Sequence, residues 1–457
     1  MKEGSLEAPT RHPIDWQSAD FYDAQSLDAE LRRVFDVCHG CRRCFSLCDS
    51  FPRLFDLIDE APSGELDSVD SKGFEPVVEA CTLCDMCFMT KCPYVPPHPF
   101  NIDFPHLMLR ARAKQLRDSG GKAPFPSGQL AQIDRNAKLT QWIAPLVNWV
   151  TNVRYKFIRK ILQAVSGIDA RAALPVLAKR FAVVDSTGAF SAAADAKARG
   201  RKVAIFATCY VNYYQTQAAR AARQVLELQG VETQLVYPGC CAMPHLEHGN
   251  IEEVVKQAKK VSAELVKWVD KGYDIVTLTA SCGLMLKSEW PLLLPDENNV
   301  ATLAKATRDI DEYVVDIARN EGLADGLRPV PGGVAVHMAC HARAQNVGPK
   351  AAEMLKLIPE AKINVIERCS GHGGTFGILA KTHDVAVKIA KPTAKAIQKT
   401  QAAHLVSDCP LAAKHLAQQL ENISETETPT TSYPITLLAK AYGLDTPGNK
   451  HETRKTS

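Results

Sequence analysis

Residues 237–244, YPGCCAMP, place Cys240 and Cys241 side by side between a Pro-Gly turn and a second proline. Adjacent cysteines do not bridge each other easily, because a disulfide between neighbours departs from ordinary disulfide geometry. The stretch has a counterpart later in the chain, IERCSGHG, in which Cys369 and Ser370 align with the cysteine pair. A pattern that occurs twice indicates an internal repeat, which decides how the C-terminal half folds.

Two further landmarks flank the cysteine pair in both copies. Each copy opens with a short segment rich in apolar residues, RKVAIFATC ending at Cys209 and GGVAVHMAC ending at Cys340. Each copy closes with a similar segment, YDIVTLTASC ending at Cys282 and AHLVSDC ending at Cys409. Helical patterns separate these segments, so we expect two α/β units in which every cysteine follows a strand. Sites of α/β folds gather at that end of the sheet.

Eight further cysteines lie near the N-terminus in two runs, CHGCRRCFSLC (38–48) and CTLCDMCFMTKC (81–92). Two-residue gaps let three thiolates reach one iron–sulfur cluster, and in two-cluster ferredoxins the fourth thiolate comes from the other run. Structural zinc favours separated cysteine pairs, and disulfides are disfavoured in a reducing compartment. We therefore expect two [4Fe–4S] clusters, one held by Cys38, Cys41, Cys44 and Cys92, the other by Cys81, Cys84, Cys87 and Cys48.

A helix is predicted immediately before the first cysteine run, in SLDAELRRVFDVC. Ser26 is the expected N-cap, and Asp28 would lie in the first turn. The apolar residues of the segment recur along one helical face: Leu27, Leu31, Val34 and Phe35. Helices beside both runs and the long spacer between them predict an all-helical ferredoxin domain, in contrast to the compact β-type.

The distribution of the fifteen cysteines divides the chain, because none lies between the N-terminal runs and the first repeat. We expect a helical two-cluster ferredoxin domain over 1–135, a helical linker over 136–195, a first α/β repeat over 196–325, a second over 326–447 and a flexible tail over 448–457.

Composition excludes several classes of protein. The net charge is +3 with acidic and basic residues interspersed, which gives no electrostatic reason to expect nucleic acid as a partner. The N-terminus has no apolar region typical of a signal peptide, and the most apolar stretch, residues 142–150, is too short to span a bilayer. We expect a cytoplasmic protein, with peripheral contact to the inner membrane left open.

The linker contains one segment with two interpretations, WIAPLVNWVTNVRYKFIRKIL (142–162). Its aromatic residues alternate with basic ones, which is typical of a helix lying on a membrane surface. The alternative is a helix that packs between domains. Because the apolar positions are not confined to one clean face, we expect the packing helix.

The repeated landmarks resemble the cysteine-rich CCG domains of heterodisulfide reductase and related iron–sulfur subunits. Together with the ferredoxin pattern, residues 30–445 resemble the family of the C subunit of anaerobic glycerol-3-phosphate dehydrogenase. The resemblance implies that each repeat can hold a cluster through a C…CC…C-x-x-C pattern. In some members that cluster is a noncubane [4Fe–4S] cluster, and one repeat can hold zinc instead.

Both repeats depart from this pattern. Thr279 stands in a cysteine position of the first repeat and Ala242 in the glycine position, while Ser370 and Ala412 replace cysteines in the second. Four thiolates hold an ordinary cluster or zinc, whereas three leave an open position. We therefore expect a third iron–sulfur cluster or zinc in the first repeat and a weaker site in the second. The expected ligands are Cys209, Cys240, Cys241 and Cys282 in the first repeat, and Cys340, Cys369 and Cys409 in the second.

Histidines near these cysteines are further ligand candidates. His341 and His372 could complete the second site, although a hydrogen bond to nearby backbone is the commoner role. The same interpretation applies to His245, His248 and His337.

Three functions remain open from the sequence. The first is an electron-transfer subunit of an oxidoreductase, partnered by a flavoprotein dehydrogenase or another redox protein, because no G-x-G-x-x-G fingerprint follows a strand here. The second is a disulfide or peroxide reductase acting at Cys240 and Cys241. The third is a docking scaffold in which the repeats hold zinc.

Overall fold

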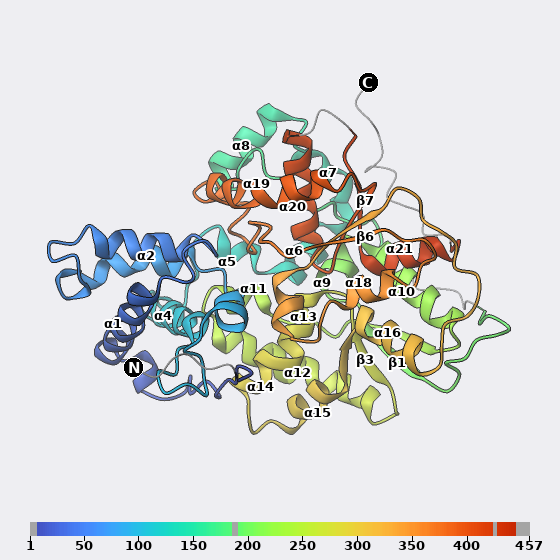
Figure 1. Cartoon of the computed structure of the whole chain (residues 1–457), viewed down its shortest axis with the longest axis horizontal. Coiled ribbons are helices and arrows are strands. Elements are labelled where there is room, and N and C mark those ends of the chain that lie inside the picture. Colours follow the sequence, from blue (N-terminus) through green and yellow to red (C-terminus); the bar gives the residue numbers. More distant parts are fainter. Residues whose placement is uncertain (1–6, 185–190, 424–426, 445–457) are drawn as a thin grey trace.

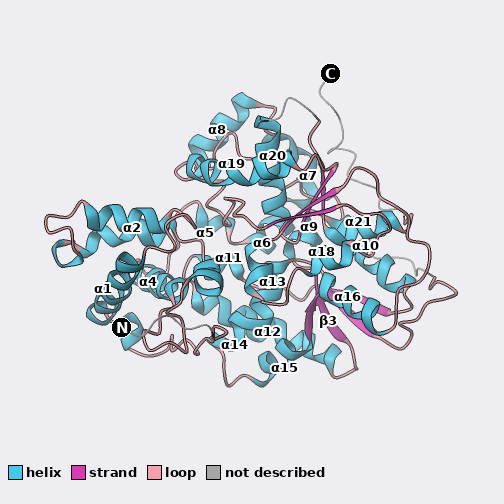
Figure 2. Ribbon diagram, viewed as in Figure 1, coloured by secondary structure: helices cyan, strands magenta, loops and turns pink. Residues whose placement is uncertain are grey.

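The structure is a computed structural model that describes residues 7–184, 191–423 and 427–444. The predicted tail over 448–457 lies outside the described residues. Figure 1 shows a helical N-terminal region beside two α/β units, with a group of linker helices next to the second unit. Figure 2 shows that the strands form two separate groups within a largely helical molecule.

The N-terminal region is helical, as predicted. Its core includes the predicted apolar face of the first helix. That helix begins earlier than expected: Asp23 is the N-cap and accepts a hydrogen bond from the Ser26 backbone N–H, so the assignment of Ser26 as N-cap is wrong. The helices are α1 (Ala24–Cys41), α2 (Ser50–Asp59), α3 (Glu75–Ala80), α4 (Phe104–Asp118) and the π-helical turn η4 (Cys87–Lys91).

The linker helices are α5 (Ser127–Leu130), α6 (Ile133–Thr140), α7 (Ala144–Thr151) and α8 (Lys156–Ser166). The prediction that this segment packs its apolar residues between domains is wrong. Trp142, Phe157 and Val165 are 80%, 77% and 71% exposed. On α8, which carries Phe157 and Val165, the buried face contains Arg159 instead. None of the helices in the described ranges has the length and apolar character needed to cross a membrane.

The first α/β repeat contains a parallel sheet with strand order β2-β1-β3-β4. Strands β1 and β3 are almost wholly buried, as expected for a parallel sheet covered on both faces. The fourth strand was not predicted. Its strands are β1 (Lys202–Phe206), β2 (Glu232–Val236), β3 (Asp274–Thr277) and β4 (Thr307–Asp309). Its helices are α9 (Cys209–Tyr213), α10 (Thr216–Leu228), α11 (Met243–Glu247), α12 (Ile251–Val269), α13 (Ala280–Leu284), α14 (Trp290–Leu293), α15 (Asn298–Ala306) and α16 (Ile310–Asn320).

The second repeat has the same topology, with strand order β6-β5-β7-β8 and parallel pairing throughout. Its strands are β5 (Val334–His337), β6 (Ile363–Ile366), β7 (His404–Ser407) and β8 (Thr430–Ser432). Its helices are α17 (Cys340–Ala344), α18 (Lys350–Leu355), α19 (His383–Lys399), α20 (Pro410–Ile423) and α21 (Pro434–Ala441).

A buried cation joins the N-terminal region to the first repeat. Arg11 donates to Asp85 (2.8 Å), Asp103 (3.0 Å) and Glu289 (3.1 Å). The apolar core of the N-terminal helices continues into the first repeat around Trp290, whereas α10 and α21 pack together in a core that joins the two repeats. The cysteine-bearing loops of all three regions are therefore held in fixed positions relative to one another.

Candidate functional site

The first predicted set of cysteines gathers around one cavity. Cys38 and Cys41 come from the end of α1, Cys44 from the following turn, and Cys92 from the second run. Burial, followed by repulsion from Cys92, Cys44 and Cys41, raises the pKa of Cys38 well above its usual value. The rest of the lining is largely apolar and includes Phe51, Phe55 and Ile102.

The second set lies against the first. Burial, followed by repulsion from Cys84, Cys81, Cys48 and Cys44, raises the pKa of Cys87 well above its usual value. The loop that carries these thiols has left-handed backbone at Leu83 and Asp85, which turns the chain tightly between successive cysteines. Each of these two groups of four therefore includes one cysteine from the other run, Cys92 in the first group and Cys48 in the second.

The four cysteines of the first repeat come together from three strand ends. The Sγ atoms of Cys209 and Cys240 are 3.8 Å apart, and those of Cys241 and Cys282 are 3.1 Å apart. The hydrogen bond with Cys240, followed by burial, raises the pKa of Cys209 well above its usual value. Burial of all four residues makes this a closed site.

Tight backbone geometry lets the adjacent cysteines share that site. Ala242 follows them in the left-handed region, with φ of 66°, and its N–H donates to the Cys240 Sγ (3.4 Å). The Cys241 carbonyl accepts a hydrogen bond from the fully buried indole of Trp290 (3.2 Å). These contacts orient the two side chains.

A cluster of aromatic residues covers the Cys209–Cys240 pair. Phe181 of the linker packs edge-on against Tyr213, and both belong to the same buried cluster as Cys209 and Cys240. Tyr237 donates a hydrogen bond to Asp134 from the start of α6. This aromatic cover was not predicted from the sequence, because its members come from the linker and from two strand ends that only the fold brings together.

The three cysteines of the second repeat are more open. Cys369 is exposed, while Cys340 and Cys409 are partly buried. Burial, followed by repulsion from Cys84, Cys369 and Cys409, raises the pKa of Cys340 well above its usual value. The second N-terminal set, through Cys84, therefore lies beside this site.

The histidines serve mainly as hydrogen-bonding groups. His341 pairs its Nδ1 with the Ser281 hydroxyl (2.9 Å) and its Nε2 with the Leu83 carbonyl (3.2 Å). His337 pairs with the Ser407 hydroxyl and the Arg368 carbonyl. The Nε2 atoms of two others, His248 and His372, are buried without a hydrogen-bond partner.

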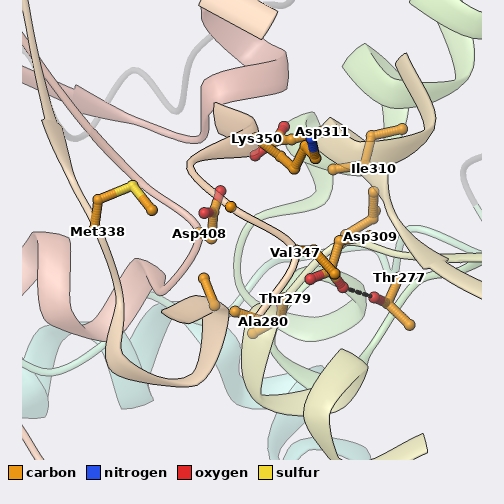
Figure 3. Close-up of a pocket in the computed structure, with 13 residues that line it drawn as sticks. Thr277, Thr279, Ala280, Asp309, Ile310, Asp311, Met338, Val347, Lys350 and Asp408 are labelled. Carbon is orange, nitrogen blue, oxygen red and sulfur yellow. Dashed lines mark hydrogen bonds between the residues drawn. The ribbon is translucent and has the colours of Figure 1, made fainter. Parts of the chain in front are cut away.

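Carboxylates from both repeats meet at the carboxyl ends of their strands. Figure 3 shows Asp309 and Asp311 from the first repeat and Asp408 from the second around one pocket, with Lys350 nearby. Burial raises the pKa of Asp309 to about 6. Gln345 donates to Asp309 (2.6 Å) and so joins the repeats. Asp408, the acidic residue directly before Cys409, is the sequence feature that could have indicated this junction.

The donor sets fit iron–sulfur clusters or zinc by their chemistry, because thiolates are the preferred ligands of both. Two sets hold four thiols in the N-terminal region, one set holds four in the first repeat, and one holds three in the second. Across the described ranges, no three or more His, Cys, Asp or Glu side chains are already spaced as ligands of a single metal ion.

Comparison with known proteins identifies the two α/β repeats. Residues 203–287 and 334–416 match the cysteine-rich domain family CCG, so the chain contains two such domains. The chain is 27% identical over 354 residues to the C subunit of anaerobic glycerol-3-phosphate dehydrogenase from Escherichia coli (strain K12), covering 75% of this chain and 83% of that protein. It is 27% identical over 218 residues to lactate utilization protein A of Bacillus pumilus (strain SAFR-032), covering 46% of this chain and 87% of that protein.

Proposed function

We propose that this chain is an iron–sulfur electron-transfer subunit of an oxidoreductase. The observation that carries the proposal is the gathering of the eight N-terminal cysteines into two groups of four, each completed by a cysteine of the other run. That exchange is typical of two-cluster ferredoxins. The ligands would be Cys38, Cys41, Cys44 and Cys92 for one [4Fe–4S] cluster, and Cys48, Cys81, Cys84 and Cys87 for the other.

A [4Fe–4S] cluster, when bound, supplies one-electron reduction and oxidation. The chain supplies thiol ligands and an apolar wall. Phe51, Phe55 and Ile102 line the first cavity beside the four cysteines and exclude water from that side. Water exclusion and hydrogen bonds to the sulfurs are the means by which a protein tunes cluster potential.

The contacts between regions support a route for electrons. Cys84 of the second N-terminal group lies near Cys369 and Cys340 of the second repeat. His341, next to Cys340, reaches the carbonyl of Leu83 on one side and the hydroxyl of Ser281 on the other. Since Leu83 adjoins Cys84 and Ser281 adjoins Cys282, one imidazole links the N-terminal region to both C-terminal sites.

A separate redox partner completes the proposal. An oxidoreductase that acts on an organic substrate needs a hydride acceptor, and this chain carries no dinucleotide fingerprint after a strand. The relative from Escherichia coli is named as one subunit of a dehydrogenase. We infer that a flavoprotein dehydrogenase, or another redox protein, exchanges electrons with this chain.

Zinc in the first repeat is a second candidate, favoured by one distance. Two thiolates on a tetrahedral zinc ion, each about 2.3 Å from the metal, lie about 3.8 Å from each other. The Sγ atoms of Cys209 and Cys240 are already 3.8 Å apart. A multi-iron cluster would need this pair to separate, and either metal would need the Sγ atoms of Cys241 and Cys282, 3.1 Å apart, to separate.

Thiol chemistry at Cys240 and Cys241 has less support. A nucleophilic cysteine must be accessible and ionised near neutral pH. Both residues are buried. Hydrogen bonds among the neighbouring cysteines and burial together raise the pKa of each well above its usual value. The geometry suits metal ligands better than a reductase nucleophile.

Anaerobic purification of the full chain tests the proposal. We expect about eight irons from the two N-terminal groups, a visible absorption that bleaches on addition of dithionite, and a paramagnetic signal in the reduced protein. Cys92→Ala should damage the group containing Cys38 and leave the group containing Cys81 intact. A protein that binds only zinc under these conditions would rule out electron transfer.

A further inference from the structure

The linker helices carry most of the exposed apolar surface of the described chain. Nine of its fourteen exposed large apolar residues lie between Leu139 and Val165. α7 and α8 pack against each other, and the rings of Trp149 and Tyr155 are 5.5 Å apart. We call this surface the α7–α8 patch and define it by Trp142, Leu146, Trp149, Phe157, Ile161 and Val165.

The exposed position of these side chains is built into α8. Phe157, Ile161 and Val165 follow one another at four-residue spacing and therefore lie along one face of the helix. The opposite face contains Arg159, which is 0% exposed. Its guanidinium donates to the backbone carbonyls of Thr151, Asp169, Ala170 and Ala172. A cation holds the helix to the protein, while the apolar stripe faces outward.

The segment that carries the patch has charges of a single sign. Residues 135–168 contain six basic residues and no acidic one. Apart from Arg159, all of these basic residues are exposed, and Lys156 and Lys160 lie beside the apolar stripe of α8. Lysines at such a border can extend their charged ends toward a polar surface while their stems cover apolar neighbours.

We propose that the α7–α8 patch docks on the surface of an anionic phospholipid bilayer. An apolar face containing Trp and Phe, bordered by Lys and Arg, is typical of helices that lie in the interface of a membrane. Anionic headgroups attract such a basic border, with about 1 kcal/mol for each basic residue. A protein partner fits this surface less well, because lysine is depleted in protein–protein interfaces.

Docking through this patch would turn the linker that covers the first-repeat cysteines toward the lipid. The linker that carries the patch also covers them: Asn148 of α7 exchanges two hydrogen bonds with Leu177 (2.8 and 2.9 Å). Ala178 in turn donates to the carbonyl of Tyr213, which packs with Cys209. Docking uses the outer surface of this cover and does not depend on whether the cysteines hold a metal.

Vesicle flotation of the full-length chain tests the proposal. We expect the protein to float with vesicles of phosphatidylcholine mixed with phosphatidylglycerol, to float less well as salt is added, and to bind phosphatidylcholine alone weakly. The emission of Trp142 and Trp149 should shift to shorter wavelength on binding, because both side chains are exposed in the free protein.

Matched variants assign the effect to the patch. Phe157→Ser/Ile161→Ser/Val165→Ser should abolish binding, whereas Leu357→Ser/Val365→Ser, which changes exposed apolar residues elsewhere, should leave it unchanged. Arg154→Gln/Lys156→Gln/Lys160→Gln should weaken binding to anionic vesicles by about a hundredfold. Absence of flotation by the unmodified protein would overturn the proposal. So would lipid-independent self-association that the serine triple variant abolishes, since the patch would then be an interface between copies.

Discussion

The two α/β repeats share one topology and differ at the site that the topology creates. In both, a cysteine follows each of the first three strands of the repeat. The first repeat holds four buried thiols under a cover of linker residues, whereas the second holds three, of which Cys369 is exposed. The shared fold therefore determines where the cysteines lie, and the individual side chains determine whether the site is closed or open.

The open site of the second repeat and the closed site of the first also have different surroundings. The open site lies beside Cys84 and the second N-terminal group. The closed site lies on the side covered by α6, α7 and Phe181. The site of the second repeat therefore faces the N-terminal cysteines, and the site of the first repeat is the more protected of the two.

The largest expected effect comes from making the first repeat resemble the second. Cys241→Ser should abolish metal binding in the first repeat, because Cys241 and Cys282 form one closely packed pair among the four proposed ligands (3.1 Å). Loss of a direct ligand should exceed the roughly 10–100-fold cost of losing an outer partner. Metal analysis of the full chain should show the first-repeat metal missing while the N-terminal iron is retained.

The reciprocal variant is the matched control. Ser370 is 9% exposed and aligns with Cys241, so Ser370→Cys gives the second repeat the adjacent pair that the first already has. We expect tighter metal binding in the second repeat and no change in the first. An unchanged metal content in both variants would mean that the adjacent pair does not distinguish the repeats.

The next effect is a difference in acid stability. Burial lowers the pKa of His337 and His415 to about 4 and that of His372 to about 3. The unfolded chain would take up protons below pH of about 6.5 while these buried imidazoles stay neutral, so stability is present above that pH and lost as pH falls toward 4. At 1.36 kcal/mol for each pKa unit, the upper bound is about 3 kcal/mol for His337 or His415 and about 5 kcal/mol for His372.

Hydrogen exchange resolves this effect by region. The second repeat holds three histidines with a pKa of about 4 or below, whereas the first holds one, His248, with a pKa of about 4. Between pH 7 and pH 5, after correction for the intrinsic rates, strands β5–β7 should therefore lose protection before strands β1–β3. His415→Gln should reduce the acid sensitivity of the second repeat, which separates histidine protonation from protonation of the cysteine ligands. Earlier loss of protection in the first repeat would contradict the expectation.

Sequence patterns predicted the parts of this comparison that depend on neighbours along the chain. The apolar spacing of Leu27, Leu31 and Val34 predicted a buried helical face, and the repeated landmarks predicted that the cysteines of each repeat follow its strands. The three-residue strands β4 and β8 are too short to leave a pattern.

Contacts between the N-terminal region and the second repeat could not be predicted. Nothing near Cys84 in the sequence indicates Cys340 or Cys369, and the pairing depends on how three regions pack. The outward face of α8 was misread for a related reason: an arginine, bonded to four backbone carbonyls, occupies the buried side where an apolar residue is usual.

The smallest expected effect concerns the residue after each cysteine pair. Ala242 has φ of 66° and Gly371, its counterpart, has φ of 72°. A left-handed conformation costs a non-glycine residue about 1–2 kcal/mol, part of which is offset because glycine loses more freedom on folding. Ala242→Gly should therefore raise the free energy of unfolding by about 1 kcal/mol or less, measured by urea denaturation. Gly371→Ala should do the opposite and more strongly, since an added Cβ would lie 2.2 Å from the carbonyl oxygen of Ala386. If Ala242→Gly destabilised the protein, packing of the Ala242 methyl group would outweigh backbone strain, and the alanine would be a feature of the closed site in its own right.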